Sequence, residues 1–471
     1  AGRSGHAPGR PSRVTLVPTH TMELVEAVAA RRAAHAGRVE KRESPDKPLD
    51  VLVQHLVTVA LGGGFISEEL YEEVRGAYAY RELTREEWQW ALNFVERGGE
   101  SLHAYPEYHR VQLVDGVYRV PDRGIARRHK LQVGTIVGDA TMQVKYLSGG
   151  KIGTIEESFI ARLKKGDCFL FGGRLLEFVR VQDLVAYVRR AERKRGAVPR
   201  WNGGKMPLSN EMGDMMLQVL RGAAQGDFFE PELQAAQPML VTQQRLSHLP
   251  SPGTLLVERY VSREGHHLYL YPFAGRYVHM GLASLLAWRL AKDRPNTFSL
   301  SFNDYGLELL SALPVDVSPV LDGRAFTTGH LLEDVLASLN SSELSQRRFR
   351  EIARVAGLVF TGYPGAPKSM KQLQASSSLF YEVFRKYDAG NLLLAQAERE
   401  VLSQELDIRR LSATLKAMAA QRIDEVVLRH PSPMSLPLMV ERFREQLTTE
   451  KLADRLERIL RETEKTLQKT P

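Results

Sequence analysis

The sequence predicts a multidomain α+β protein with a winged helix, a small β-barrel and a mainly helical C-terminal domain that carries a small β insertion. Three observations lead to this prediction. Amphipathic helices followed by a hairpin occupy residues 49–129. Short alternating strands with glycine turns and a basic connector occupy residues 130–200. Helical periodicity dominates residues 201–471, and the chain of 471 residues is long enough for several domains.

The first 48 residues form the first predicted region. The β-branched stretch "VTLV" at 14–17 predicts a short buried strand. Residues 21–36 predict a helix with Met22, Val25 and Val28 on one face. The charged segment 38–48 contains two prolines, so we expect a linker and a domain boundary there.

The winged-helix prediction for residues 49–129 depends on local signals. An apolar helix at 49–61 ends in three glycines, and two further helices follow. Thr84 and Glu87 have capping-box spacing at the start of the third helix. Asp115-Gly116 is a typical tight turn between two strands. Helices followed by such a hairpin are typical of winged helices, many of which bind DNA and many others only protein.

The β-barrel prediction begins at residue 130. The stretch "TMQVKYLSGG" alternates polar and apolar residues, and "DCFLFGGRLLEFVRV" contains two strands around Gly172-Gly173. Several short strands separated by glycine turns are typical of small barrels.

Positive charge is concentrated in one part of the chain. The net charge is +8, and residues 101–200 hold 19 Lys/Arg against 10 Asp/Glu. Such a concentration indicates a phosphate-binding surface, although a solvated basic face without a partner remains an alternative. The candidate nucleic-acid contacts are the basic residues Arg127, Arg128, Lys130, Arg193, Lys194, Arg195, Arg200 and Lys205.

Trp201 lies in the loop "PRWNGG", directly after the most basic stretch. An aromatic ring beside arginines and glycines suits stacking on a nucleic-acid base. The other interpretation is a structural anchor in a domain junction. Both interpretations remain open at this point.

The C-terminal region offers no catalytic or metal-binding motif. Met212, Met215 and Met216 share a helix face, as core residues do. His266 and His267 are adjacent in a predicted strand, so their side chains point to opposite faces and cannot coordinate one metal ion together. The stretch "GYPGAPKS" at 362–369 lacks phosphate-loop spacing and contains two prolines, so we predict a helix–helix loop.

Composition limits the compartment and the chemistry. The single cysteine, Cys168, excludes an intrachain disulfide and a Cys-x-x-Cys zinc pair. No apolar run approaches the ~18 residues that span a bilayer. We therefore expect a cytoplasmic protein without a metal site or a membrane partner.

Several segments carry a resemblance to a known family. The opening "AGRSGHAPGRPSRVTLVP" resembles motif VI of superfamily 2 helicases, beginning after its first arginine. The stretches "HKLQVGTI", "VPRWNGGKMPLS" and "TFSLSFNDYGLELL" are similar to the C-terminal modules of the large helicase-related (Lhr) family. The resemblance is strongest to its bacterial ligase-associated DEXH-box branch.

This resemblance implies that the chain is the C-terminal part of a longer enzyme. Residues 1–48 would be the end of a second RecA-like domain. The longer protein would be an ATP-dependent DNA helicase that uses ATP and Mg²⁺. It would move 3′ to 5′ on single-stranded DNA, unwind duplexes or RNA–DNA hybrids, and act in DNA repair. A DNA ligase or a nuclease would be a candidate protein partner.

The resemblance also implies roles for individual residues. Arg3 matches the motif VI arginine finger, with Gly2 and Gly5 as backbone neighbours of the nucleotide. Trp201 matches a Pro-x-Trp position that stacks on a base of the tracking strand. No Walker A or Walker B motif is found in this sequence, so we expect no cofactor and no ATP turnover from this chain alone. A stand-alone winged-helix regulator and a protein-interaction scaffold remain the alternatives.

Overall fold

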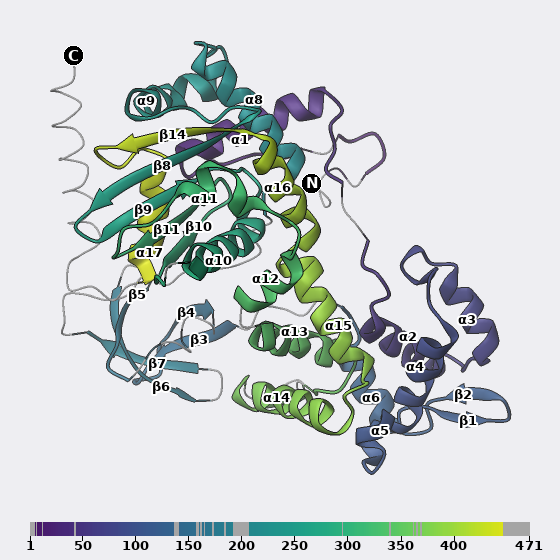
Figure 1. Cartoon of the computed structure of the whole chain (residues 1–471). Helices are drawn as coiled ribbons and strands as arrows, with labels where there is room; N and C mark the ends of the chain where they lie inside the picture. Colours follow the sequence, from purple (N-terminus) through teal and green to yellow (C-terminus); the bar gives the residue numbers. More distant parts are fainter. Residues whose placement is uncertain are drawn as a thin grey trace. The chain divides into compact units, whose positions relative to one another are not determined.

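The structure is a computed structural model. It describes the chain except for residues 1–4, 6, 12, 42–43, 136–140, 157–159, 161–162, 164, 172–173, 183–184, 192–206, 294, 339–340, 361, 364–365, 368–369 and 446–471. The chain divides into two compact units, each built from separate segments (Figure 1). Unit 1 comprises Ala1–Lys41, Met206–Leu339 and Leu406–Pro471. Unit 2 comprises Arg42–Lys205 and Asn340–Glu405.

A five-stranded sheet with the order β10-β11-β9-β8-β14 forms the centre of unit 1. Four antiparallel strands make up the β insertion expected from the sequence: β8 (Thr254–Ser262), β9 (Gly265–Leu270), β10 (Ser299–Phe302) and β11 (Leu307–Ser311). The fifth strand, β14 (Arg422–Leu428), pairs parallel with β8 and was not expected. This strand forms one edge of the sheet, and it begins about 160 residues after the end of β8.

Helices cover this sheet. The larger ones are α1 (Thr21–His35), α8 (Asn210–Ala224), α9 (Pro231–Leu246), α10 (Arg276–Asp293), α16 (Ile408–Ala420) and α17 (Ser435–Glu445), and the shorter ones are α11 (Ser318–Leu321) and α12 (Leu331–Ser338). Helix α1 packs against α8 and α9, and their apolar side chains form one core with Leu256 and Tyr269 of the sheet. Met215 and Met216 are buried in this core, as the sequence predicted.

The predicted strand at 14–17 is wrong. Residues 13–18 have no regular secondary structure, and Val14, Leu16 and Val17 are exposed. A β-branched run forms a strand only where a neighbouring strand supplies its hydrogen bonds, and no described strand pairs with this segment. The helix after it is confirmed, but it belongs to the core of unit 1.

The winged helix of unit 2 has the three predicted helices and the predicted hairpin, which are α2 (Leu49–Leu61), α3 (Ser67–Arg75), α4 (Arg85–Arg97), β1 (Gln112–Val114) and β2 (Val117–Arg119). Two further helices, the short α5 (Gly99–Leu102) and α6 (Arg123–Gln132), were not predicted. The Thr84 hydroxyl accepts from the Glu87 amide at 3.2 Å, and the Glu87 carboxylate accepts from the Thr84 amide at 2.9 Å. Asp115 and Gly116 have φ of +50° and +78°, the backbone that a tight hairpin turn requires.

The region predicted as a β-barrel is a five-stranded sheet with the order β4-β3-β7-β6-β5. Its strands are β3 (Thr141–Tyr146), β4 (Lys151–Glu156), β5 (Cys168–Phe171), β6 (Arg174–Gln182) and β7 (Val185–Arg190). A Cβ on Gly153 of β4 would lie 3.0 Å from the ring of Phe171 in β5, so the two edge strands approach each other. No described residues pair β4 with β5, and closure into a barrel stays a prediction.

A helical segment completes unit 2. It contains α13 (Ser341–Val355), the two-residue strands β12 (Gly362–Tyr363) and β13 (Ala366–Pro367), α14 (Met370–Tyr387), α15 (Leu392–Glu400) and a π-helical turn (Val401–Glu405). Phe349 and Phe384 share a core with Leu52 and Phe94 of the winged helix. The structure therefore differs from the predicted single domain at 201–471, because these amphipathic helices bury their apolar faces against the winged helix.

Candidate nucleic-acid interface

Helix α6 presents a basic stripe. The Asp122 side chain caps the helix by accepting from the Ile125 amide at 2.7 Å, and Ile125 is buried. Arg127 and Lys130 are exposed on the outer face, together with Arg123. Positions i, i+4 and i+7 lie on one side of a helix, so these three cations form one surface. Sequence reasoning missed Arg123, although its spacing from Arg127 would have identified it.

Arg128 lies apart from this stripe. It is half-buried and lines a cavity in unit 2, so it does not share the outer surface with Arg127. The next residue, His129, holds α6 against α2 through a 2.8 Å hydrogen bond between its Nε2 and the Thr58 hydroxyl. Burial and the positive charge of Arg110 lower the pKa of His129 to about 4.

The basic connector begins at the end of strand β7. Arg189 and Arg190 are exposed there, and Arg189 donates to the Glu177 carboxylate at 2.7 Å. Several predicted site residues lie outside the part of the chain that the structure describes: Gly2, Arg3, Arg193, Lys194, Arg195, Arg200, Trp201 and Lys205.

Gly5 is the described member of the predicted nucleotide-contacting group. Its φ is +71°, in the region that favours glycine. A Cβ at this position would lie 2.8 Å from the carbonyl oxygen of Pro11 and 2.9 Å from that of Arg10. The segment folds back on itself tightly enough that only glycine fits here.

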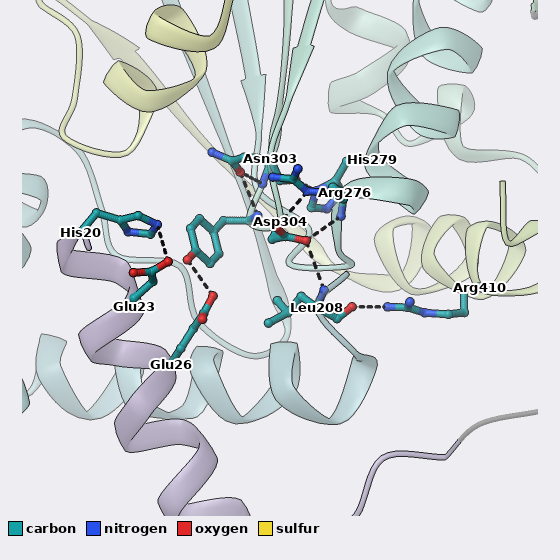
Figure 2. A network of polar contacts seen from close by, with 11 residues as sticks. His20, Glu23, Glu26, Leu208, Arg276, His279, Asn303, Asp304 and Arg410 are labelled. Atoms are coloured by element: carbon teal, nitrogen blue, oxygen red, sulfur yellow. Dashed lines mark hydrogen bonds and ion pairs between the residues drawn. The ribbon is translucent and has the colours of Figure 1, made fainter. Parts of the chain in front are cut away.

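A polar network in unit 1 holds Leu208, which follows Trp201 in sequence by a few residues (Figure 2). The Asp304 carboxylate accepts from the backbone amide of Leu208 at 3.2 Å and from the Arg276 guanidinium at 3.1 Å. The Arg410 guanidinium donates to the carbonyl oxygen of Leu208 at 2.9 Å and to that of Ala274 at 2.7 Å. Both polar groups of Leu208 are therefore held by charged side chains from separate segments.

The same network includes helix α1. The Tyr305 hydroxyl donates to the Glu26 carboxylate at 2.7 Å, and burial raises the pKa of Glu26 (Figure 2). The Asn303 side chain accepts from the amides of Tyr305 and Gly306 at 2.9 Å each, which fixes the turn between β10 and β11. This turn thus contacts α1 through Tyr305 and Leu208 through Asp304. No motif in the sequence indicated this arrangement.

His279 is buried behind this turn with a defined tautomer. Its Nε2 accepts from the Ala274 amide at 3.0 Å, so its Nδ1 must donate to the Asn303 carbonyl oxygen at 2.7 Å. Both contacts require the neutral ring. Burial lowers the pKa of His279 to about 4.

We expect His279 to make unit 1 less stable in acid. The unfolded imidazole binds a proton near its ordinary pKa of 6.5, whereas the folded ring binds one only near pH 4. The unfolded state thus holds more protons between these values, and this residue should lower the free energy of unfolding by about 3 kcal/mol as the pH falls through them.

Urea unfolding curves at about pH 7, 5.5 and 4.5 measure this effect. His279→Gln keeps a donor and an acceptor but does not titrate, so its stability should depend less on pH than that of the native chain. Equal pH dependence in the two proteins would contradict the assignment.

The described residues contain neither a candidate metal-binding cluster nor a helix that could span a membrane. No group of three or more His, Cys, Asp or Glu side chains is arranged to hold a metal ion in the described ranges. Within the same ranges, none of the helices is both long and apolar enough to cross a membrane.

The described fold is a multidomain α+β architecture, and one of its two units contains a winged helix with a basic helix face. Comparison with known proteins refines this class. Residues 32–198 match the winged helix domain of the large helicase-related protein family, and residues 249–435 match the DEAD/H associated family. The chain belongs to the large helicase-related (Lhr) family, which confirms the family predicted from the sequence. Its place in the ligase-associated branch stays a prediction.

Named relatives support this assignment. The chain is 26% identical to the ATP-dependent helicase Lhr-Core protein 2 of Thermococcus barophilus, over 93% of this chain and 53% of that protein. It is 25% identical to the ATP-dependent helicase Lhr-Core of Methanocaldococcus jannaschii, over 93% and 52%. It is also 25% identical to the Lhr helicase/uracil glycosylase of Escherichia coli, over 93% and 30%. The chain spans about half the length, or less, of these relatives.

A solved structure has the same fold. The Mycobacterium smegmatis helicase Lhr bound to ssDNA and AMP-PNP matches with a TM-score of 0.66 and 22% identity, over 93% of this chain and 54% of that chain. The match extends over both units. The relative therefore also contains the separate chain segments from which each unit is built.

Proposed function

We propose that this chain is the nucleic-acid-binding C-terminal part of an ATP-dependent, 3′-to-5′ single-stranded DNA translocase or helicase that acts in DNA repair. One observation carries the proposal: a relative that shares the fold over 93% of this chain was solved with bound ssDNA. The concentration of positive charge at 101–200 supports it, because phosphate contacts provide most of the affinity of such proteins.

The α6 stripe and Trp201 together suggest how a strand would be bound. The α6 stripe of Arg123, Arg127 and Lys130 would contact phosphates without reading sequence. Trp201 would stack on a base, which is a sequence-tolerant contact. Asp304 and Arg410 would support that stack from a distance, because they fix Leu208 a few residues after Trp201.

The nucleotide chemistry would depend on the longer protein. There, Gly2, Arg3 and Gly5 would lie beside the γ-phosphate of ATP, and residues of the nucleotide-binding lobe would hold Mg²⁺. Arg3 would stabilise charge on the transferring phosphoryl group. We further propose a cytoplasmic location, single-stranded DNA or an RNA–DNA hybrid as substrate, and a DNA ligase or nuclease as candidate partner.

Trp201→Ala tests the DNA-binding proposal. If the ring stacks on a base, the variant should lose about 1–3 kcal/mol of affinity for single-stranded DNA while its melting temperature stays near that of the native chain. Trp201→Phe should retain part of the affinity, because an aromatic face remains. Affinity and thermal melting are measured on the same preparations.

The alternatives give different outcomes. A buried junction tryptophan would cost about 3–5 kcal/mol of stability on truncation, and binding would be lost only through unfolding. Trp288→Ala is a matched control, since Trp288 on α10 is half-buried and contacts Lys292, and it should affect melting but not DNA affinity. A strong preference of the native chain for one duplex sequence would instead favour the winged-helix regulator.

A further inference from the structure

A cavity of about 310 Å³ lies within unit 2, between the winged helix and the helices α13 and α14. Its volume is in the range of small-ligand pockets. Three arginines line it, and aromatic rings cover another part of its wall. These residues are Arg110, Arg128, Arg354, Tyr108, Phe360 and Phe380.

Arg110 is the most buried of the three arginines that line this cavity. Only 7% of its surface is exposed, and its Nη1 donates to the carbonyl oxygen of Ala356 at 2.5 Å. Its Nε has no hydrogen-bond partner among the described residues. The guanidinium lies 5.5 Å from the centre of the Phe94 ring, and no described carboxylate pairs with it. A buried positive charge without a counter-charge is unfavourable, so an anion in the cavity would stabilise it.

The other two arginines add to this positive charge. Arg128 comes from α6 and Arg354 from α13, and both are half-buried. Neither forms an ion pair among the described residues. The negative charge of Glu351 favours the protonated form of Arg354. The Glu351 carboxylate, however, accepts a hydrogen bond from the Arg348 guanidinium at 2.5 Å. Burial lowers the pKa of Arg110 to about 10, so this residue remains protonated at neutral pH.

The lining offers little negative charge to oppose an anion. The carboxylate that lines the cavity belongs to Glu107, and that side chain is exposed. The ring of Phe380 and the side chain of Leu379 provide an apolar wall. A ligand with an anionic group at one end and an apolar group at the other would match the arginines and the apolar wall.

We propose that this cavity binds a phosphate group, with Arg110, Arg128 and Arg354 as its cations. Guanidinium groups match the geometry of phosphate oxygens and are suited to this role. The phosphate comes either from a nucleic-acid strand or from a free phosphate or nucleotide. The described lining contains none of Arg123, Arg127 and Lys130, so a titration with inorganic phosphate tests this cavity independently of the proposed function.

Isothermal titration with inorganic phosphate tests the site. We expect saturable binding to the native chain with about one equivalent per chain, and competition by sulfate. Arg128→Ala should weaken binding at least tenfold. Arg97→Ala, at an exposed arginine of the winged helix that does not line the cavity, should change it less than twofold. Glu107→Gln should strengthen binding, because it removes the negative charge from the lining. A native chain that binds no phosphate, or an Arg128→Ala variant that binds equally well, overturns the proposal.

A second titration identifies the source of the phosphate. A short oligothymidylate without terminal phosphates and adenosine monophosphate are each titrated with and without saturating inorganic phosphate. Competition between oligothymidylate and phosphate that disappears in Arg128→Ala assigns the site to a strand phosphate. Competition by adenosine monophosphate alone assigns it to a free nucleotide. If neither competes while inorganic phosphate binds, the ligand is the free ion.

Discussion

Arg3→Ala should reduce ATP turnover about a thousandfold in a protein that holds this chain together with the nucleotide-binding lobe. An arginine finger contacts the γ-phosphoryl group mainly when charge builds up in the transition state. Its removal should therefore lower kcat while the affinity for single-stranded DNA without nucleotide stays unchanged. Steady-state phosphate release in the presence of single-stranded DNA measures turnover, and fluorescence anisotropy measures DNA binding.

Arg10→Ala is the matched control for this experiment. Arg10 is an exposed arginine in the same segment, and its backbone amide contacts Ala7. Turnover by this variant should remain within about twofold of the native rate. A variant of Arg3 that keeps its turnover but binds DNA poorly would show that the motif VI assignment is wrong.

The winged helix was predictable because each of its signals is local. The reciprocal hydrogen bonds of Thr84 and Glu87 involve residues three apart, and the Asp115-Gly116 turn depends on two adjacent residues. The apolar run and the three glycines after it placed α2, and the capping-box spacing placed the start of α4. The Lhr family was also predictable, because segments spread along most of the chain resemble it.

The division into units was not predictable from periodicity. The pattern of an amphipathic helix predicts which of its faces is buried, but not which element packs against that face. Helices α13 to α15 therefore looked like a continuation of the C-terminal domain, whereas Phe349 and Phe384 complete the core of the winged helix. Strand β14 was missed for the same reason, because its pairing with β8 depends on a distant segment.

The candidate site was only partly predictable. Composition identified the basic residues Arg127, Arg128 and Lys130, but only the structure places them on a helix and separates the exposed Arg127 from Arg128 in the cavity. The hydrogen bonds of Asp304 and Arg410 to Leu208 join residues about 100 and 200 positions apart. Single polar residues at such distances carry no periodic signal. The assignment of Trp201 and Arg3 depends on family resemblance and awaits the variants described above.

Glu258→Ala should lower the free energy of unfolding of unit 1 by about 3–5 kcal/mol. Glu258 is fully buried in β8, and its carboxylate accepts hydrogen bonds from the Gln243 amide at 2.9 Å and from the Tyr271 and Ser432 hydroxyls at 2.8 Å each. These donors come from α9, the end of β9 and the segment before α17. Truncation leaves three buried donors without an acceptor and opens a cavity, so both penalties act together.

Glu258→Gln separates the hydrogen bonds of this carboxylate from its charge. The glutamine oxygen can accept from Gln243, and the hydroxyls of Tyr271 and Ser432 can accept from its amide group instead of donating. We therefore expect this variant to lose only about 1 kcal/mol. Hydrogen exchange of the β8 and β9 amides in increasing urea measures both variants within unit 1. An alanine variant as stable as the glutamine variant would contradict the assignment. A glutamine variant more stable than the native chain would show that the buried charge is itself unfavourable, since no described cation pairs with it.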